Sequence, residues 1–167
     1  MQAIQISDVK GCMNHMLLKN TFDHFSLVEA TITTKATFVL DGALVDGYYD
    51  ESELAALGGN VPKFMPYGEA RNICLDVIKG KKTPGFFKFV FSAPRDIIAQ
   101  LIAVNDISID IDDVASLSLN IRYQNELLYA TTGSSLKVFT PDKSLDNAWD
   151  EYVEKFLTAS DISYDKM

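Results

Sequence analysis

Few side chains of this chain could act as catalysts, and their spacing matches no known catalytic pattern. The best acid–base candidate is the pair Asp23-His24, which directly precedes a strand-like run from Phe25. Neighbouring residues of a strand face opposite sides, and no serine or cysteine nucleophile stands beside the pair in the sequence. A small hydrolase would need His24 to meet Asp23, Asp46 or Asp50 in a pocket. The sequence therefore favours a polar turn, and we predict no catalytic residue.

Metal-binding patterns are weak as well. The chain has 2 histidines, which is a poor supply for a transition-metal site. An acidic run, Asp106, Asp110, Asp112 and Asp113, could gather hard cations. However, the run has neither the turn glycine nor the terminal glutamate of a calcium loop. It is more typical of a solvated acidic edge, and we expect neither a metal nor a cofactor.

Three lysines, Lys79, Lys81 and Lys82, stand around Gly80 after a predicted helix. A phosphate loop would require an earlier glycine, a Ser or Thr after the lysine, and a preceding strand, so nucleotide binding of that type is rejected. Cations at a helix C-terminus interact favourably with the helix dipole, which is the simpler explanation. Contact with an anionic partner is the alternative that these three lysines leave open.

Residues 49–67 bring aromatic side chains into a segment punctuated by glycine and proline. Loops displayed on a regular scaffold often carry binding function. The alternative is that these aromatic side chains cover one open end of the core. The candidate surface for a partner or ligand consists of Tyr48, Tyr49, Phe64, Met65 and Tyr67.

The elements that would position these residues follow from apolar periodicity. Helical spacing predicts helices near residues 9–19, 70–79, 94–102 and 146–157, and Gly80 suits a left-handed cap after the second. Alternating residues predict strands at 2–6, 25–34, 36–40 and 43–48, and again at 86–91, 117–123, 127–132 and 135–139. The order strand-helix-three strands-helix thus occurs twice, in residues 1–81 and 85–159. We predict an α+β domain spanning 1–167, with an antiparallel sheet, two pseudo-equivalent halves, about four main helices and a tail at 160–167.

Composition limits the classes of function. The chain has 167 residues, of which 47% are hydrophobic, and carries a net charge of −8. The charge disfavours a broad nucleic-acid surface without excluding one. No apolar run approaches the length of a membrane helix, and no signal peptide begins the chain, so we expect a cytoplasmic protein with no membrane association. Cys12 and Cys74 occupy apolar helical positions and are predicted to be buried hydrophobes.

The order of elements resembles TATA-binding-protein-like folds and the halves of sliding-clamp domains, by topology alone. A DNA-binding saddle would need basic and wedging side chains on its exposed sheet face. The strand positions that we expect to face outward carry little net charge, and they are Thr31, Thr33, Ser118, Asn120 and Arg122.

Several stretches are similar to an uncharacterised family of short bacterial, Firmicute-type proteins. The resemblance rests on residues 22–25, 28–30, 78–84, 119–123, 131–133 and 148–150 and on the opening strand and helix. It implies a self-standing bacterial domain and supplies no catalytic residue. The leading hypothesis is a non-catalytic binding or interaction module for an unidentified protein or small molecule. A nucleic-acid-associated domain of clamp-like or saddle-like architecture and a small hydrolase are the alternatives, and a homo-oligomer is left open.

Overall fold

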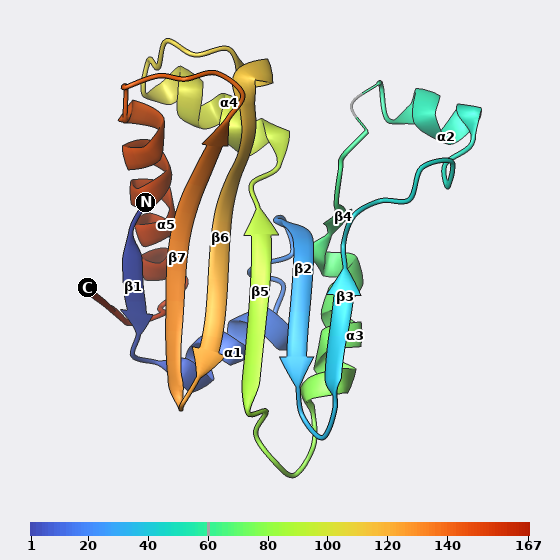
Figure 1. Ribbon diagram of the computed structural model, residues 1–167, viewed down its shortest axis with the longest axis vertical. Helices are drawn as coiled ribbons and strands as arrows, with labels where there is room; N and C mark the ends of the chain where they lie inside the picture. Colours follow the sequence, from blue (N-terminus) through green and yellow to red (C-terminus); the bar gives the residue numbers. More distant parts are fainter. Residues whose placement is uncertain (60) are drawn as a thin grey trace.

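The computed structural model describes residues 1–59 and 61–167, and within them the chain forms an eight-stranded antiparallel sheet (Figure 1). Seven strands follow the order β3-β2-β5-β6-β7-β1-β8, and β4 pairs with β2. The strands are β1 (Ala3–Ile6), β2 (Ser26–Thr33), β3 (Thr37–Asp41), β4 (Met65–Pro66), β5 (Phe86–Ser92), β6 (Val114–Gln124), β7 (Leu127–Leu136) and β8 (Tyr164–Lys166). The helices are α1 (Val9–Leu17), α2 (Glu51–Ala56), α3 (Tyr67–Ile78), α4 (Arg95–Val104) and α5 (Ser144–Ala159), with a short 3-10 helix, η1 (Ile111–Asp113).

The core lies on one face of this sheet. Strand residues alternate between the two faces, so Phe87, Phe89 and Phe91 of β5 all point to the same side, and all three are buried. The four longer helices cover this side, behind the sheet in the view of Figure 1. Helix α3 contacts β2 and α5 contacts β7, while α1 packs against α3 and α4 packs against α5.

The opposite face of the sheet carries no helix in the described part of the chain (Figure 1). The pairing register places Thr31 beside Lys88 and Lys88 beside Arg122, all on this face. The outward positions predicted from the sequence lie here, half-buried or exposed, between buried residues of the same strands. This open face is therefore a mixed polar surface.

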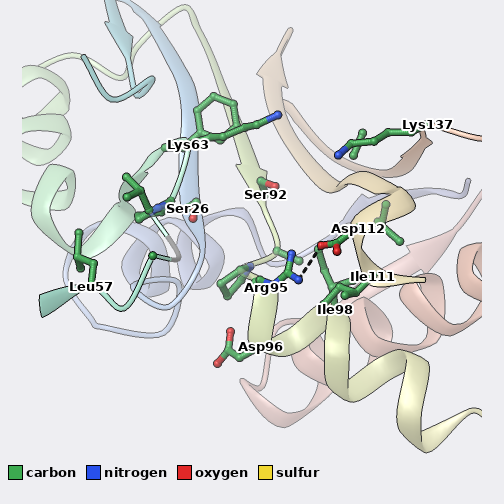
Figure 2. A pocket seen from close by; sticks show the side chains of 18 residues that line it. Ser26, Leu57, Lys63, Ser92, Arg95, Asp96, Ile98, Ile111, Asp112 and Lys137 are labelled. Atoms are coloured by element: carbon green, nitrogen blue, oxygen red, sulfur yellow. Dashed lines mark hydrogen bonds and ion pairs between the residues drawn. The ribbon is translucent and has the colours of Figure 1, made fainter. Parts of the chain in front are cut away.

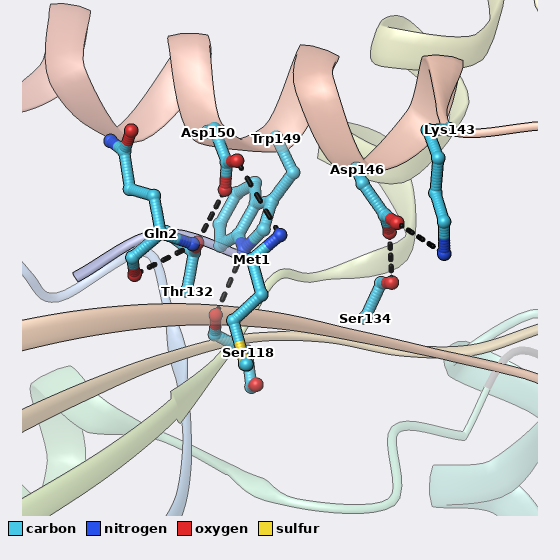
Figure 3. Close-up of polar contacts among 9 residues, drawn as sticks. All are labelled: Met1, Gln2, Ser118, Thr132, Ser134, Lys143, Asp146, Trp149 and Asp150. Carbon is cyan, nitrogen blue, oxygen red and sulfur yellow. Dashed lines mark hydrogen bonds and ion pairs between the residues drawn. The ribbon is translucent and has the colours of Figure 1, made fainter.

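Polar contacts fix the last helix on the sheet (Figure 3). The indole Nε1 of Trp149 donates to the carbonyl oxygen of Ser118 at 2.8 Å, and the Thr132 hydroxyl donates to the carboxylate of Asp150. Thr132 is itself buried, so the hydrogen bond satisfies a polar group that would otherwise be costly to bury. These contacts join α5 to β6 and β7 while apolar residues of the helix enter the core.

The predicted α+β class, antiparallel sheet and four main helices are confirmed, but three details are wrong. Residues 43–48 form no strand, apart from an isolated bridge between Ala43 and Phe64. Residues 127–136 form one continuous strand, because Gly133 pairs with Ser118 within the ladder and makes no turn. The tail beyond residue 160 contains β8, which pairs with β1.

The order of the strands gives no support to the predicted twofold relation between the halves. Strands β5, β6 and β7 are neighbours, whereas β1 lies beside β7 and is separated from β2 by three strands. The end of α3 also differs from the prediction. Lys79 is the C-cap, with φ −61° and ψ 135°, and the chain leaves the helix in an extended conformation. Gly80 has no left-handed φ, since the extended exit does not require one.

None of the helices in the described part of the chain is both long enough and apolar enough to cross a membrane.

Phe25 offers a direct test of the one-sided core. Its ring is fully buried and contacts Phe91 and Phe156 at ring-centroid distances of 5.9 and 5.2 Å. Phe25→Ala should lower the free energy of unfolding by about 3–5 kcal/mol, measured by urea denaturation, because a large cavity is created. Phe139→Ala is the matched control, since that ring is 96% exposed, and it should change stability by no more than about 0.5 kcal/mol. Equal losses in the two variants would contradict this assignment of the core.

Candidate functional site

An arm, defined here as residues 43–59 and 61–64, leaves the sheet after β3 and returns at β4; it projects beside the sheet in Figure 1. Two backbone hydrogen bonds close its base: Leu44 N donates to Lys63 O at 2.9 Å, and Met65 N donates to Gly42 O at 2.8 Å. Helix α2 begins with a capping box, in which the Asp50 side chain accepts from the Glu53 amide and the Glu53 side chain accepts from the Asp50 amide. Local hydrogen bonds therefore hold the arm, since α2 contains no buried residue.

Between the arm and the first turn of α4 lies a cleft of about 600 Å³ (Figure 2). It draws residues from β2, the arm, the end of β5, α4, η1 and the start of β6. Its apolar wall includes Leu57, Val61, Phe64, Ala93, Ile98, Ile111 and Val114. Its polar groups are those of Ser26, Lys63, Ser92, Arg95, Asp96, Asp112 and Lys137. A volume of this size fits an organic molecule of moderate size.

The polar groups of the cleft are unevenly paired. Arg95 Nη2 binds Asp112 Oδ1 at 2.8 Å. Within the described residues, Lys63 and Lys137 take part in no ion pair, and the hydroxyl of Ser92 has no hydrogen-bond partner. Figure 2 shows Lys63 and Lys137 on opposite sides of Ser92. The cleft thus holds cationic and hydroxyl groups whose interactions are incomplete.

The five aromatic and methionine candidates do not gather in one place. Phe64 lines the cleft. Tyr48 is 75% exposed and stacks edge-on with Tyr49 at 5.2 Å, on the arm. Met65 belongs to β4 and is half-buried. Tyr67 is a core residue: its hydroxyl donates to the carbonyl oxygen of Met16 at 2.8 Å, and burial raises its pKa. Tyr67 therefore covers the core, as the alternative interpretation expected, and only Phe64 faces the cleft.

The three lysines near Gly80 lie at the other end of β5 from the cleft, in the loop that joins α3 to β5 (Figure 1). Lys79 Nζ pairs with Asp76 Oδ1 at 2.8 Å, and both side chains are well exposed. Lys81 and Lys82 are exposed as well. None of these three lysines lines the cleft that Phe64 borders.

The possible acid–base groups are dispersed. Asp23 Oδ1 binds Arg71 Nε at 2.9 Å, whereas the ring of His24 lies against that of Phe25, tilted by 37° with the ring centroids 4.1 Å apart. Asp50 is used as the cap of α2. Over residues 1–59 and 61–167, no group of three or more His, Cys, Asp or Glu side chains is arranged to hold a metal ion.

Three polar residues of the cleft, Ser92, Lys63 and Lys137, were not among the residues predicted from the sequence. One signal was present: Ser92-Ala93-Pro94 is the junction between a strand and a helix, where backbone amides become available. Lys63 and Lys137 are far apart in the sequence. Both line the cleft because the arm that carries Lys63 lies beside it. No spacing rule connects them.

The fold and the cleft define an α+β protein with one open sheet face and a projecting arm beside a partly polar cleft. The chain belongs to a family of unknown function (DUF5721), whose model matches residues 15–165. This agrees with the resemblance to an uncharacterised family noted in the sequence. A search of curated proteins and a search of solved structures each gave no match.

Gly42, at the base of the arm, should be intolerant of a side chain. A Cβ atom there would overlap the carbonyl oxygen of Leu27, which is rigid backbone of β2. Gly42→Ala should lower the free energy of unfolding by about 1–3 kcal/mol, as overpacking does elsewhere, and should shift the amide signals of the arm in a ¹⁵N–¹H spectrum. Gly85→Ala is the control, since nothing lies within 4 Å of its added Cβ. A Gly42→Ala protein as stable as this control, with an unchanged spectrum, would show that the arm is anchored differently.

The two free cysteines should be unreactive in the folded protein. Burial, followed by the charge of Asp8, raises the pKa of Cys12 from 9.0 to about 12, and burial raises the pKa of Cys74 to about 11. Since the thiolate is the nucleophile, neither thiol should react appreciably with a disulfide reagent at pH 8. Both should react within minutes in guanidinium chloride. Rapid labelling of either thiol without denaturant would contradict the packing of α1 or α3.

Proposed function

We propose that this protein is a non-catalytic binding module whose ligand occupies the cleft between the arm and α4. The carrying observation is the cleft itself: about 600 Å³, with an apolar wall and a few polar groups gathered from six elements. Binding sites for small organic molecules commonly have this size and this mixture of surfaces. Phe64 supplies an aromatic side chain at the wall, so part of the proposed ligand surface from the sequence is kept.

Within the residues that the structure describes, no histidine lines the cleft beside its hydroxyl groups, which supports a binding role over a hydrolase. A serine nucleophile requires a base within hydrogen-bond reach. The chain has 2 histidines. His15 Nδ1 lies 2.7 Å from the Thr21 hydroxyl, and the ring of His24 lies against that of Phe25. Neither histidine lines the cleft.

The open sheet face gives little support to the alternative of nucleic-acid binding. Lys88 and Arg122 lie on that face, but Glu29 and Asp165 lie there too. Single-sign basic surfaces drive binding to nucleic acids, and this face carries both signs. A bacterial, cytoplasmic origin belongs to the same proposal, and two free cysteines are compatible with a reducing compartment.

The binding role can be tested by titrating ¹⁵N-labelled protein with four small probes: phenol, benzylamine, benzoate and phenyl phosphate. At least one probe should shift the amide signals of cleft residues such as Phe64 and Ala115 in a saturable manner. Ala115→Trp should abolish these shifts by filling the cleft from β6, where Ala115 is exposed. Ala99→Trp places the same ring on an exposed position of α4 that does not line the cleft, and it should leave them intact. If no probe shifts cleft signals, or if Ala115→Trp binds as well as Ala99→Trp, the cleft is not a binding site.

A further inference from the structure

We propose that the cleft binds the phosphate group of a phosphate monoester, between the first turn of α4, the hydroxyl of Ser92 and the cations Lys63 and Lys137. This inference rests on the proposed function, because it names the chemical class of the ligand for the same cleft.

The first turn of α4 supplies unpaired donors. Pro94 is the N-cap and has no side-chain hydrogen bond to the helix. The amides of Ile97 and Ile98 donate to Pro94 O, whereas the amides of Arg95 and Asp96 have no acceptor among the described residues. All three of Pro94, Arg95 and Asp96 line the cleft. Free amides and the positive end of a ten-residue helix favour an anion at this position.

Ser92 is an independent indication of a ligand. Its side chain is 8% exposed, yet it lines the cleft, and no described residue accepts or donates a hydrogen bond at its hydroxyl. The Ser92 hydroxyl is not one of the fully buried atoms without a partner, because it reaches the cleft, where a ligand or water can form a hydrogen bond with it. Ser26 pairs with Ser92 across the β2–β5 ladder and lines the same cleft, so a second hydroxyl stands on the neighbouring strand. The two strands therefore present adjacent hydroxyl groups directly before the free end of α4.

The charges around Ser92 match an anion. Lys63 reaches the cleft from the arm, and Lys137 reaches it from the residue after β7. Neither forms an ion pair within the described residues, although the chain as a whole carries a net charge of −8. Most cations of an acidic protein have a carboxylate nearby, so lysines without such a partner can bind an anionic ligand. Arg95 also lines the cleft, but its charge is balanced by Asp112, to which it binds at 2.8 Å.

The two carboxylates that line the cleft do not remove this preference. Asp112 is neutralised by Arg95 at 2.8 Å. Asp96 lies on the far side of Arg95 from Ser92 in Figure 2. Its charge acts on residues outside the cleft: burial lowers the pKa of His24, which Asp96 partly offsets, and burial together with Asp96 raises the pKa of Tyr152. Asp96 thus lines the cleft and is also close enough to His24 and Tyr152 for its charge to affect both.

Several donors and two cations that form no ion pair within the described residues, Lys63 and Lys137, suit a phosphate monoester better than a carboxylate. A phosphate monoester offers three terminal oxygens and close to two charges at neutral pH, whereas a carboxylate offers two oxygens and one charge. The apolar wall with Leu57, Phe64 and Val114 would accommodate the organic part of the ester. The ligand class is therefore an organic phosphate with an apolar or aromatic moiety.

The test compares dissociation constants for phenyl phosphate, benzoate and phenol, measured by ¹⁵N–¹H titration. Phenyl phosphate should bind at least about tenfold more tightly than phenol, with benzoate between them, because hydrogen bonds to charged groups are the stronger ones. Ser92→Ala and Lys137→Gln should each weaken phenyl phosphate binding by about five- to tenfold and leave phenol binding unchanged.

Matched controls separate site effects from general ones. Ser116→Ala and Lys155→Gln change the same residue types outside the cleft; Ser116 lies on β6, and Lys155 pairs with Glu151 on α5. Both variants should bind phenyl phosphate as the parent protein does. Lys63→Gln and Lys137→Gln alter exposed side chains and should leave the protein folded. They therefore still test the phosphate site if Ser92→Ala unfolds the protein.

The outcomes separate the two proposals. If phenol binds in the cleft as tightly as phenyl phosphate, the binding role stands and the phosphate site is overturned. Benzoate binding at least as tight as phenyl phosphate overturns the phosphate class in the same way. Retention of affinity within about twofold in Ser92→Ala, Lys63→Gln and Lys137→Gln overturns the assigned contacts. Failure of every probe to reach the cleft removes both proposals.

Discussion

Phe87, Phe89 and Phe91 point to one side of β5, and helices cover only that side of the sheet. Because β5 pairs with β2 and β6, its buried face continues onto both neighbours and sets which residues of each strand enter the core. A shift of one residue in any of these registers would expose the phenylalanines and bury Lys88, so the register is strongly specified. Because only one face is buried, α3 packs on β2 and α5 packs on β7, both on that face. The positions of these helices in turn determine where the chain leaves and enters the sheet beside them.

Local patterns in the sequence were sufficient for most elements. The helix stripes around Cys12, Cys74 and Trp149 and the alternation in β2, β5 and β6 predict elements that the structure contains. The errors occurred where pairing partners decide the outcome. Gly133 resembles a turn glycine locally, but the length of β6 opposite it extends β7 through that position. Strand β8 exists because β1 offers it an edge, and no pattern within three residues could indicate this.

The candidate site was predicted only in part. Of the aromatic candidates in and around residues 49–67, Phe64 borders the cleft. The aromatic residues around it have separate local roles, which composition alone does not distinguish: Tyr67 packs into the core, and Tyr48 contacts Tyr49. Ser92 and Lys137 line the cleft together with residues of the arm. These segments are far apart in the sequence, so a single sequence does not show that they are neighbours.

The pairing of β1 with β7 also has a consequence for the order of folding during synthesis. Residues 3–6 pair with residues 128–131, so β1 acquires this partner only after more than a hundred further residues have been made. Strands β2, β3 and β5 can pair with one another much earlier. Ile4 and Ile6 must meanwhile stay without a ladder. The nascent protein therefore passes through a stage in which an apolar strand is free to associate wrongly, a period in which a chaperone would have most effect.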